Sequence, residues 1–237
     1  MFSLLSPKII YLKLILTMAI WGGAFVIGRV VAQNMSPFSA GLGRFAVASV
    51  FLWLLSLTRQ DKLPRLNLRQ TLLTICLGLS GILAYNLFFF LGLRDISASR
   101  AGLIIALNPV GITLASRLFF REKLTYLKMI GAATSLLGAG LIITEGDLGI
   151  ILTQGIGKGE LALIGCVISW VTYSLIGKLV MRELSVLATT TYGIWVGTVL
   201  LLPWAIWEQN NRLPQIDLFT GLGLAYLGIL ATVVAFN

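Results

Sequence analysis

Eight long apolar segments run through this chain, and they restrict its fold more than any other feature. A helix that crosses the hydrocarbon core of a membrane needs about 20 predominantly apolar residues. The segments of that length are roughly 13–32, 39–57, 71–92, 100–118, 126–144, 159–179, 187–206 and 218–237. Short polar breaks separate them, so the pattern predicts an all-α fold, a polytopic transmembrane helical bundle.

The composition agrees with a membrane location. Hydrophobic residues make up 57% of the chain and charged residues 11%, and the mean hydropathy is +0.93. Soluble domains carry roughly 25% charged residues, which cover their surface. The chain has no histidine, and its two cysteines, Cys76 and Cys166, lie far apart within apolar segments. Their spacing matches no metal or redox motif, and we expect neither a metal nor a cofactor.

The lysines and arginines are distributed unevenly between alternate loops. With a cytoplasmic N-terminus, the cytoplasmic side carries 12 of the 18 basic residues and 3 of the 9 acidic residues. The whole formal net charge of +9 then lies on that side, in agreement with the positive-inside rule. We therefore expect a multi-pass protein of the plasma or inner membrane, with a cytoplasmic N-terminus and no nucleic-acid partner.

Two sequence patterns occur twice. Trp21 is followed after six residues by a glycine and a basic residue, and Trp170 is followed by the same pattern at an offset of 149. Gly81 begins the tetrapeptide Gly-Ile-Leu-Ala, which returns at Gly228 with an offset of 147. Because internal similarity at a fixed offset indicates a repeated structural unit, these matches predict a repeat of five helices.

The repeat divides the chain into residues 1–146, with five helices, and residues 159–237, with three. Five is an odd number, so the second copy enters the membrane in the opposite orientation. Inverted repeats of this kind recur in secondary transporters, which bind substrate near the midplane between the halves. Eight of an expected ten helices are present, and we expect a C-terminally truncated sequence.

Several motifs then resemble the EamA-type families of the drug/metabolite transporter superfamily. Arg44 opens an Arg-x-x-x-Ala pattern, Pro109 ends a segment of the fourth helix, and Glu122 lies in an Arg-Glu-x-Leu turn. Gly131 and Gly138 match glycines of the fifth helix. The resemblance covers essentially the whole chain. It implies ten helices, cytoplasmic termini, and export or exchange of small metabolites.

Polar residues within the apolar segments are the first candidates for a substrate cavity. Arg44 either lines the cavity and attracts an anionic group, or reaches a headgroup or a helix end, because a charged side chain in the membrane is costly. Asn86 either lines the cavity or hydrogen-bonds to a neighbouring helix, and Asn237 is its candidate repeat mate. Asn108 precedes Pro109, where the chain forms either a broken helix at the site or a packing kink.

Aromatic residues are the second group of candidates. Trp21 and Trp170 share a repeat position, and Tyr173 and Tyr85 lie close to the other candidates in the sequence. These four side chains form either aromatic cavity walls or ordinary packing contacts.

Three further residues are assigned structural or gating roles. Glu122 either forms a salt-bridged turn that fixes the fourth helix against the fifth, or takes part in gating or proton coupling. Gly131 and Gly138 belong to a glycine-rich fifth helix with a small-residue stripe, and Gly193 and Gly197 form a GxxxG pattern in the seventh helix. Small residues in such a pattern allow membrane helices to approach closely.

The favoured function is a secondary transporter of small metabolites, such as amino acids or drugs, that works by alternating access between the repeats. Its expected partners are a small-molecule substrate and the lipid bilayer, with a second copy of the chain in a homodimer as a further candidate. A non-transporting or regulatory membrane protein is the first alternative. An integral-membrane enzyme is the second, although the chain lacks histidine and an Asp-rich motif.

Overall fold

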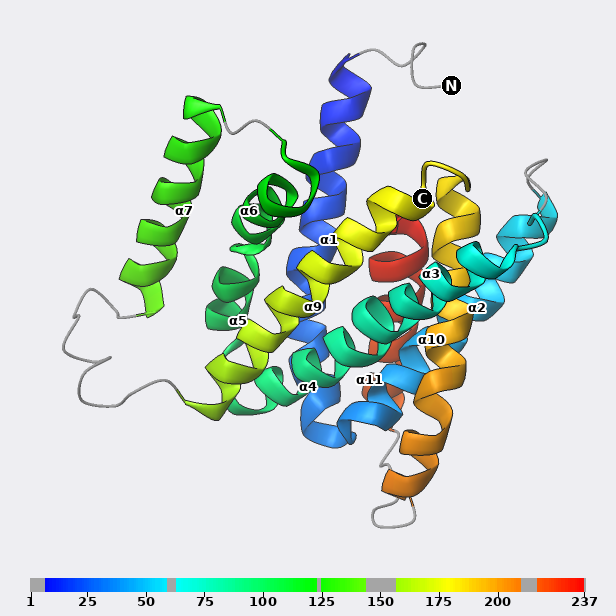
Figure 1. The fold of residues 1–237 in the computed structure, drawn as a ribbon. Coiled ribbons are helices and arrows are strands. Elements are labelled where there is room, and N and C mark those ends of the chain that lie inside the picture. The colour runs from blue at the N-terminus through cyan, green and yellow to red at the C-terminus, as the bar shows by residue number, and fades with distance from the viewer. Residues whose placement is uncertain (1–6, 59–62, 123–124, 144–156, 210–216, 237) are drawn as a thin grey trace.

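The computed structural model describes residues 7–58, 63–122, 125–143, 157–209 and 217–236, and builds them mainly from helices (Figure 1). The helices are α1 (Pro7–Asn34), α2 (Pro37–Thr58), α3 (Leu68–Leu77), α4 (Tyr85–Asp95), α5 (Ala98–Ile105), α6 (Asn108–Phe120), α7 (Tyr126–Ile143), α9 (Lys158–Val180), α10 (Val186–Gln209) and α11 (Leu218–Ala225). Two π-helical segments, η2 (Gly78–Ala84) and η3 (Tyr226–Val234), continue α3 and α11. Six helical spans in the described part are long and apolar enough to cross a membrane, with Leu68–Asp95 (α3, η2 and α4) and Ala98–Phe120 (α5 and α6) counted as one span each. The predicted polytopic helical bundle is confirmed.

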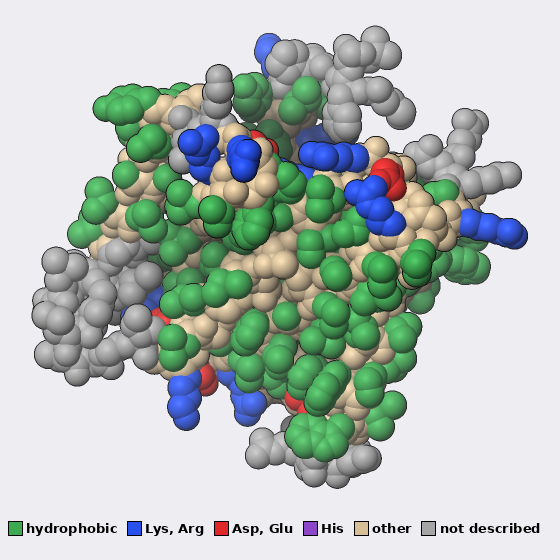
Figure 2. Space-filling model, in the orientation of Figure 1, with side chains coloured by type: hydrophobic (Ala, Val, Ile, Leu, Met, Phe, Trp, Pro, Cys, Tyr) green, Lys and Arg blue, Asp and Glu red, His purple; other side chains and the backbone are tan. Residues whose placement is uncertain are grey.

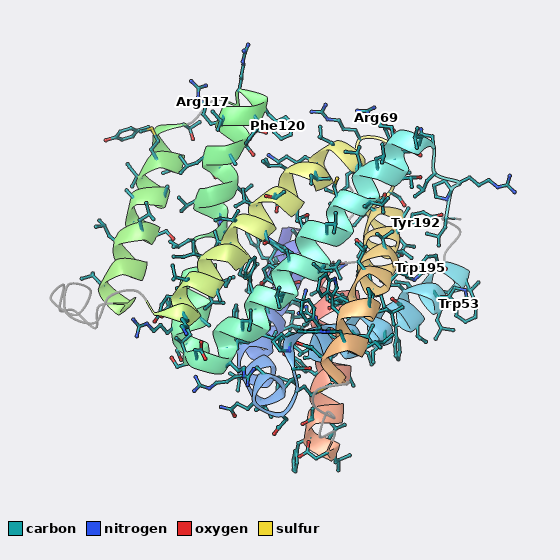
Figure 3. The ribbon with its side chains drawn as sticks, turned by 60° about the horizontal axis from the view of Figure 1, so that its bottom comes forward. Trp53, Arg69, Arg117, Phe120, Tyr192 and Trp195 are labelled. Atoms are coloured by element: carbon teal, nitrogen blue, oxygen red, sulfur yellow. The ribbon has the colours of Figure 1, made fainter. Side chains whose placement is uncertain are left out.

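Successive membrane spans run in alternating directions across the bundle, whereas α3 and α4, like α5 and α6, continue in one direction within a span (Figure 1). The start of α1, the end of α2 and the turn between α9 and α10 lie at one end, with the start of α7 (Figure 1). Arg69 and Arg117 lie at this end too (Figure 3). Lys and Arg side chains gather at the two ends of the visible face, and a hydrophobic band lies between them (Figure 2). This distribution suits lipid around the band and water at the ends.

The helix contacts occur in pairs that the sequence offset relates. The first two helices, α1 and α2, both pack against η3, and their counterparts α9 and α10 both pack against η2. At the centre α2 packs extensively against α10. Each half of the chain therefore packs its third helix against the first two helices of the other half.

Glycines of the repeated Gly-Ile-Leu-Ala tetrapeptide make these contacts close. A Cβ atom at Gly81 would overlap the Tyr173 ring, and one at Gly228 would lie 2.7 Å from the Arg44 carbonyl oxygen. Both glycines lie inside the π-helical segments η2 and η3. Such segments are rare and are frequent at functional sites.

The small residues of two helices have different outcomes. A Cβ atom at Gly197 of α10 would overlap Ile82, which confirms the close approach predicted for this helix. A Cβ atom at Gly131 or Gly138 would meet no atom within 4 Å. Within the described residues these two glycines therefore make no close helix contact, although α7 packs against α5 and α6.

Candidate functional site

A cavity of about 570 Å³ is lined mainly by residues of the first half of the chain, and Trp170 and Phe236 of the second half complete its wall. Its walls come from α1, α2, α4, α5, α6 and α9, and from Phe236 after η3. A volume of roughly 300–1,000 Å³ is typical of small-molecule sites. The aromatic residues that line it are Trp21, Phe25, Tyr85, Phe89, Trp170 and Phe236.

The aromatic rings form one contact network. The ring centroids of Trp21 and Trp170 are 6.3 Å apart with an interplanar angle of 84°, and Phe236 contacts both rings. Tyr85 lies 5.2 Å from Trp170, which stacks on Tyr173 at 5.1 Å. Edge-to-face and offset pairs of this kind stabilise each other by about 0.5–1.5 kcal/mol beyond their burial. The network fixes the wall that the two halves share.

A hydrogen bond from one tryptophan joins the halves. The Nε1 atom of Trp21 donates to the carbonyl oxygen of Ala231 at 3.1 Å. Trp21 lies in the first half of the chain, and Ala231 lies in η3 of the second half. Trp21 therefore has a polar partner in addition to its ring contacts.

Arg44 is buried on α2 and lines the cavity. Its Nε atom donates to Oγ1 of Thr232, and its Nη1 atom donates to Oδ1 of Asn86, both at 3.1 Å. The guanidinium carbon lies 5.0 Å from the centre of the Phe45 ring. Both hydrogen-bond partners of Arg44, a threonine hydroxyl and an asparagine amide, are neutral. The ion pairs within the described part of the chain join other residues.

The partners of Arg44 are themselves held by the π-helical segments. The Nδ2 atom of Asn86 donates to the carbonyl oxygen of Ile82 at 3.0 Å, and Oγ1 of Thr232 donates to that of Leu227 at 2.8 Å. These bonds turn the acceptor oxygens of Asn86 and Thr232 toward the guanidinium. Asn86 therefore hydrogen-bonds to a neighbouring helix, and it also lines the hollow described next.

A second, much smaller hollow of about 20 Å³ adjoins these groups. Arg44, Asn86, Tyr173 and Thr232 line it. Asn86 and Tyr173 therefore face this hollow, whereas Trp21, Asn108 and Pro109 line the larger cavity. Arg44, Tyr85 and Trp170 line both.

The break between α5 and α6 brings another polar group to the cavity. Helix α5 ends at Ile105, and Pro109 lies in the first turn of α6. Proline has no backbone N–H, so it cannot donate to the carbonyl oxygen of Ile105. Asn108 is buried, and its Oδ1 atom has no hydrogen-bond partner among the described residues. An unpaired buried acceptor is unfavourable by about 1–3 kcal/mol.

Glu122 lies outside this site and contacts a residue of α9. Its Oε1 atom lies 3.0 Å from Nζ of Lys178, which also donates to Oγ of Ser116 at 2.7 Å. The pair ties the end of α6 to α9. The salt-bridged turn between the fourth and fifth helices stays a prediction, because residues 123–124 of that turn lie outside the described residues. Arg121 has a left-handed backbone, with φ of 54°, and ends α6 just before Glu122.

Sequence reasoning missed Thr232 and Phe236 as site residues. Both lie shortly after the second Gly-Ile-Leu-Ala tetrapeptide, and the candidate Tyr85 follows the first. Their place after the repeated tetrapeptide is a signal that could have identified them. Asn237, the predicted repeat mate of Asn86, lies outside the described residues.

Comparison with known proteins gives consistent matches along the chain. The model of the EamA-like transporter family matches residues 8–144 and 157–237. The transporter YyaM of Bacillus subtilis (strain 168) is 26% identical over 229 residues, which cover 96% of this chain and 75% of YyaM. A transporter of Archaeoglobus fulgidus is 27% identical, with 95% of this chain and 77% of the relative covered.

One relative carries a substrate in its name. A protein of Streptantibioticus cattleyicolor described as a probable terminal-alkyne amino-acid exporter is 27% identical, with 94% of this chain and 72% of that protein covered. A solved structure described as "Crystal structure of protein" matches with a TM-score of 0.60 and 20% identity, over 93% of this chain and 76% of that chain. The structural match supports the arrangement of the helices.

Proposed function

The chain belongs to the EamA-like transporter family and is a multi-pass membrane transporter, and we propose that it is a secondary transporter of small metabolites such as amino acids or drugs. The cavity, whose wall Trp170 and Phe236 of the second half complete, is the observation that carries this proposal. Its volume suits a small molecule, and its walls combine apolar rings with few polar groups, as ligand sites do. The relative described as an amino-acid exporter supports amino acids as one substrate class to test.

We propose that transport proceeds by alternating access between two inverted repeats, residues 1–146 and residues 159–237. The paired contacts of η2 and η3 support this division, because each lies against the first two helices of the other repeat. Arg44 and Thr232 belong to different repeats and share a hydrogen bond. A rocking motion between the repeats must lengthen or exchange this bond, so we assign it to the closed contact on one side of the cavity.

We further propose that the end of the bundle where α1 begins faces the cytoplasm of the cell. The loops at this end carry the larger share of basic residues, as the charge count predicts. The N-terminus then lies inside the cell, in the plasma or inner membrane. Transport names among the relatives favour this role over that of a membrane enzyme or a regulatory protein.

Flux through reconstituted protein tests the proposed function. The purified chain is placed in liposomes loaded with one radiolabelled amino acid, and exchange against external unlabelled compounds is followed. We expect exchange above the level of protein-free liposomes for at least one compound, and loss of this exchange in Trp170→Ala. Absence of exchange across a broad panel of amino acids and drugs contradicts the proposal.

A further inference from the structure

The positive charge of Arg44 has no acidic counterpart at the cavity. The described acidic residues are Asp95, Glu122, Glu160, Glu183, Glu208 and Asp217, and the cavity lining contains none of them. Arg44 is also the one charged side chain among the described residues that line it. A buried cation with neutral partners is poorly compensated, so the site has an electrostatic preference for an anion.

The geometry of the guanidinium leaves room for such an anion. A guanidinium has five N–H groups, and the hydrogen bonds to Thr232 and Asn86 start from Nε and Nη1. Nη2 makes no hydrogen bond within the described residues, and Arg44 lines the cavity. The fork of an arginine suits a carboxylate, which accepts two parallel N–H bonds.

Asn108 supplies an independent indication of polarity elsewhere on the wall. Its side chain is nine-tenths buried, lines the cavity, and has an Oδ1 atom without a partner among the described residues. The oxygen is an acceptor, so a ligand satisfies it with an N–H or O–H group. The structure thus offers one donor site at Arg44 and one acceptor site at Asn108.

The remaining wall selects an apolar body. Trp21, Phe25 and Trp170 provide aromatic surface, and Ile105 and Ile112 provide aliphatic surface. One cationic group on an otherwise apolar wall suits a ligand with one anionic group, because a second anionic group would lie unpaired in a medium of low dielectric constant.

We propose that the substrate carries a single anionic group, a carboxylate, and that its remainder is apolar or aromatic and carries a hydrogen-bond donor. Its carboxylate binds Arg44, its donor group binds Oδ1 of Asn108, and its apolar body contacts the rings of Trp21 and Trp170. The proposal rests on the proposed transport function and narrows its substrate class. Zwitterionic amino acids with apolar side chains meet these requirements, whereas cationic amines do not.

A panel of compounds with one carbon skeleton tests the charge preference on the unmodified chain. 3-Phenylpropanoate, 3-phenylpropanol and 3-phenylpropylamine differ in charge, and phenylalanine adds a donor group to the carboxylate. Their affinities for the purified chain are measured by calorimetry, and their exchange is measured in proteoliposomes. We expect the carboxylate to bind about tenfold more tightly than the alcohol, phenylalanine to bind at least as tightly as the carboxylate, and the amine to bind more weakly than the alcohol.

Two variants locate the preference. Arg44→Gln should weaken binding of 3-phenylpropanoate about tenfold and leave that of 3-phenylpropanol unchanged, because the alcohol does not need the charge. Arg94→Gln is the matched control, since it removes the same charge from an exposed position outside the cavity and should change neither affinity. If Arg44→Gln fails to fold, the panel on the unmodified chain still decides the charge preference.

The outcomes separate the substrate class from transport itself. Binding of the carboxylates without exchange of any compound overturns the proposed function and supports the anion site. Exchange of the amine in preference to the carboxylate overturns the substrate class and supports transport. Absence of both binding and exchange for the whole panel overturns the substrate class, whereas transport is then decided by the broad panel of amino acids and drugs.

Discussion

Trp21 and Trp170 lie edge to face, with ring centroids 6.3 Å apart, although 149 positions separate them in the chain. They occupy the same position in the sequence repeat. If a two-fold axis relates the two copies of the repeat, equivalent residues can contact each other only where they lie close to that axis. The contact between the two tryptophans therefore suggests that this part of the cavity wall lies near such an axis. The same relation explains why η2 and η3 are π-helical in corresponding helices.

Gly81→Ala should destabilise the chain by about 1–3 kcal/mol, because the added methyl group would overlap the Tyr173 ring and overpacking has a free-energy cost of this size. Thermal unfolding in detergent measures the effect. Gly221→Ala in α11 is the control, since a Cβ atom there meets no neighbour within 4 Å. Equal melting temperatures for the two variants would contradict the close contact between η2 and α9.

Much of the fold could be predicted from the sequence, because apolar length alone decides whether a helix can cross a membrane. The six long membrane spans and the close approach at Gly197 follow from such local patterns. The π-helical segments do not, since a shift of the hydrogen bond from the fourth to the fifth preceding residue leaves no mark in the composition of residues 78–84.

Contacts between distant residues were harder to predict. Glu122 has basic neighbours in the sequence, and those neighbours suggested a local bridge; its partner Lys178 comes from a helix that only the folded bundle brings near. Thr232 was overlooked because an isolated threonine in an apolar helix usually bonds to its own backbone. Here it does so and also accepts from Arg44.

The pair of Glu122 and Lys178 decides between a structural and a gating role. Both side chains are partly exposed, at 45% and 38%, and pairs of this kind contribute about 0.2–1 kcal/mol. A structural role predicts that Glu122→Gln lowers the stability by no more than this and leaves the rate of exchange unchanged. A change in the pH dependence of exchange, measured in proteoliposomes between Glu122→Gln and the parent, would instead support gating or proton coupling.

Pro109→Ala should impair transport. Alanine supplies the N–H group that proline lacks, so α5 and α6 can join, whereas the stability should change little, because proline is tolerated in the first turn of a helix. Continuation of the helix would turn Asn108 away from the cavity, and we expect exchange to fall about tenfold. Pro203→Ala is the control, because Pro203 is exposed within the continuous helix α10. Unchanged exchange in Pro109→Ala would show that the break is a packing feature alone.

Thr232→Val tests the contact between the two repeats at its centre. Valine keeps the shape of threonine and removes the oxygen that accepts from Nε of Arg44 at 3.1 Å. Hydrogen bonds to a charged group contribute about 1.5–3 kcal/mol, so the melting temperature in detergent should fall. Because the lost bond joins the repeats, the variant should also favour the state in which they separate on this side. Faster modification of a cysteine placed at Ser99, on the cavity wall, would report that shift.

Thr113→Val is the control, since its hydroxyl donates to the backbone of its own helix at Pro109 and both repeats keep their contact. A fall in stability without a change in the modification rate would limit the Arg44–Thr232 bond to a structural role.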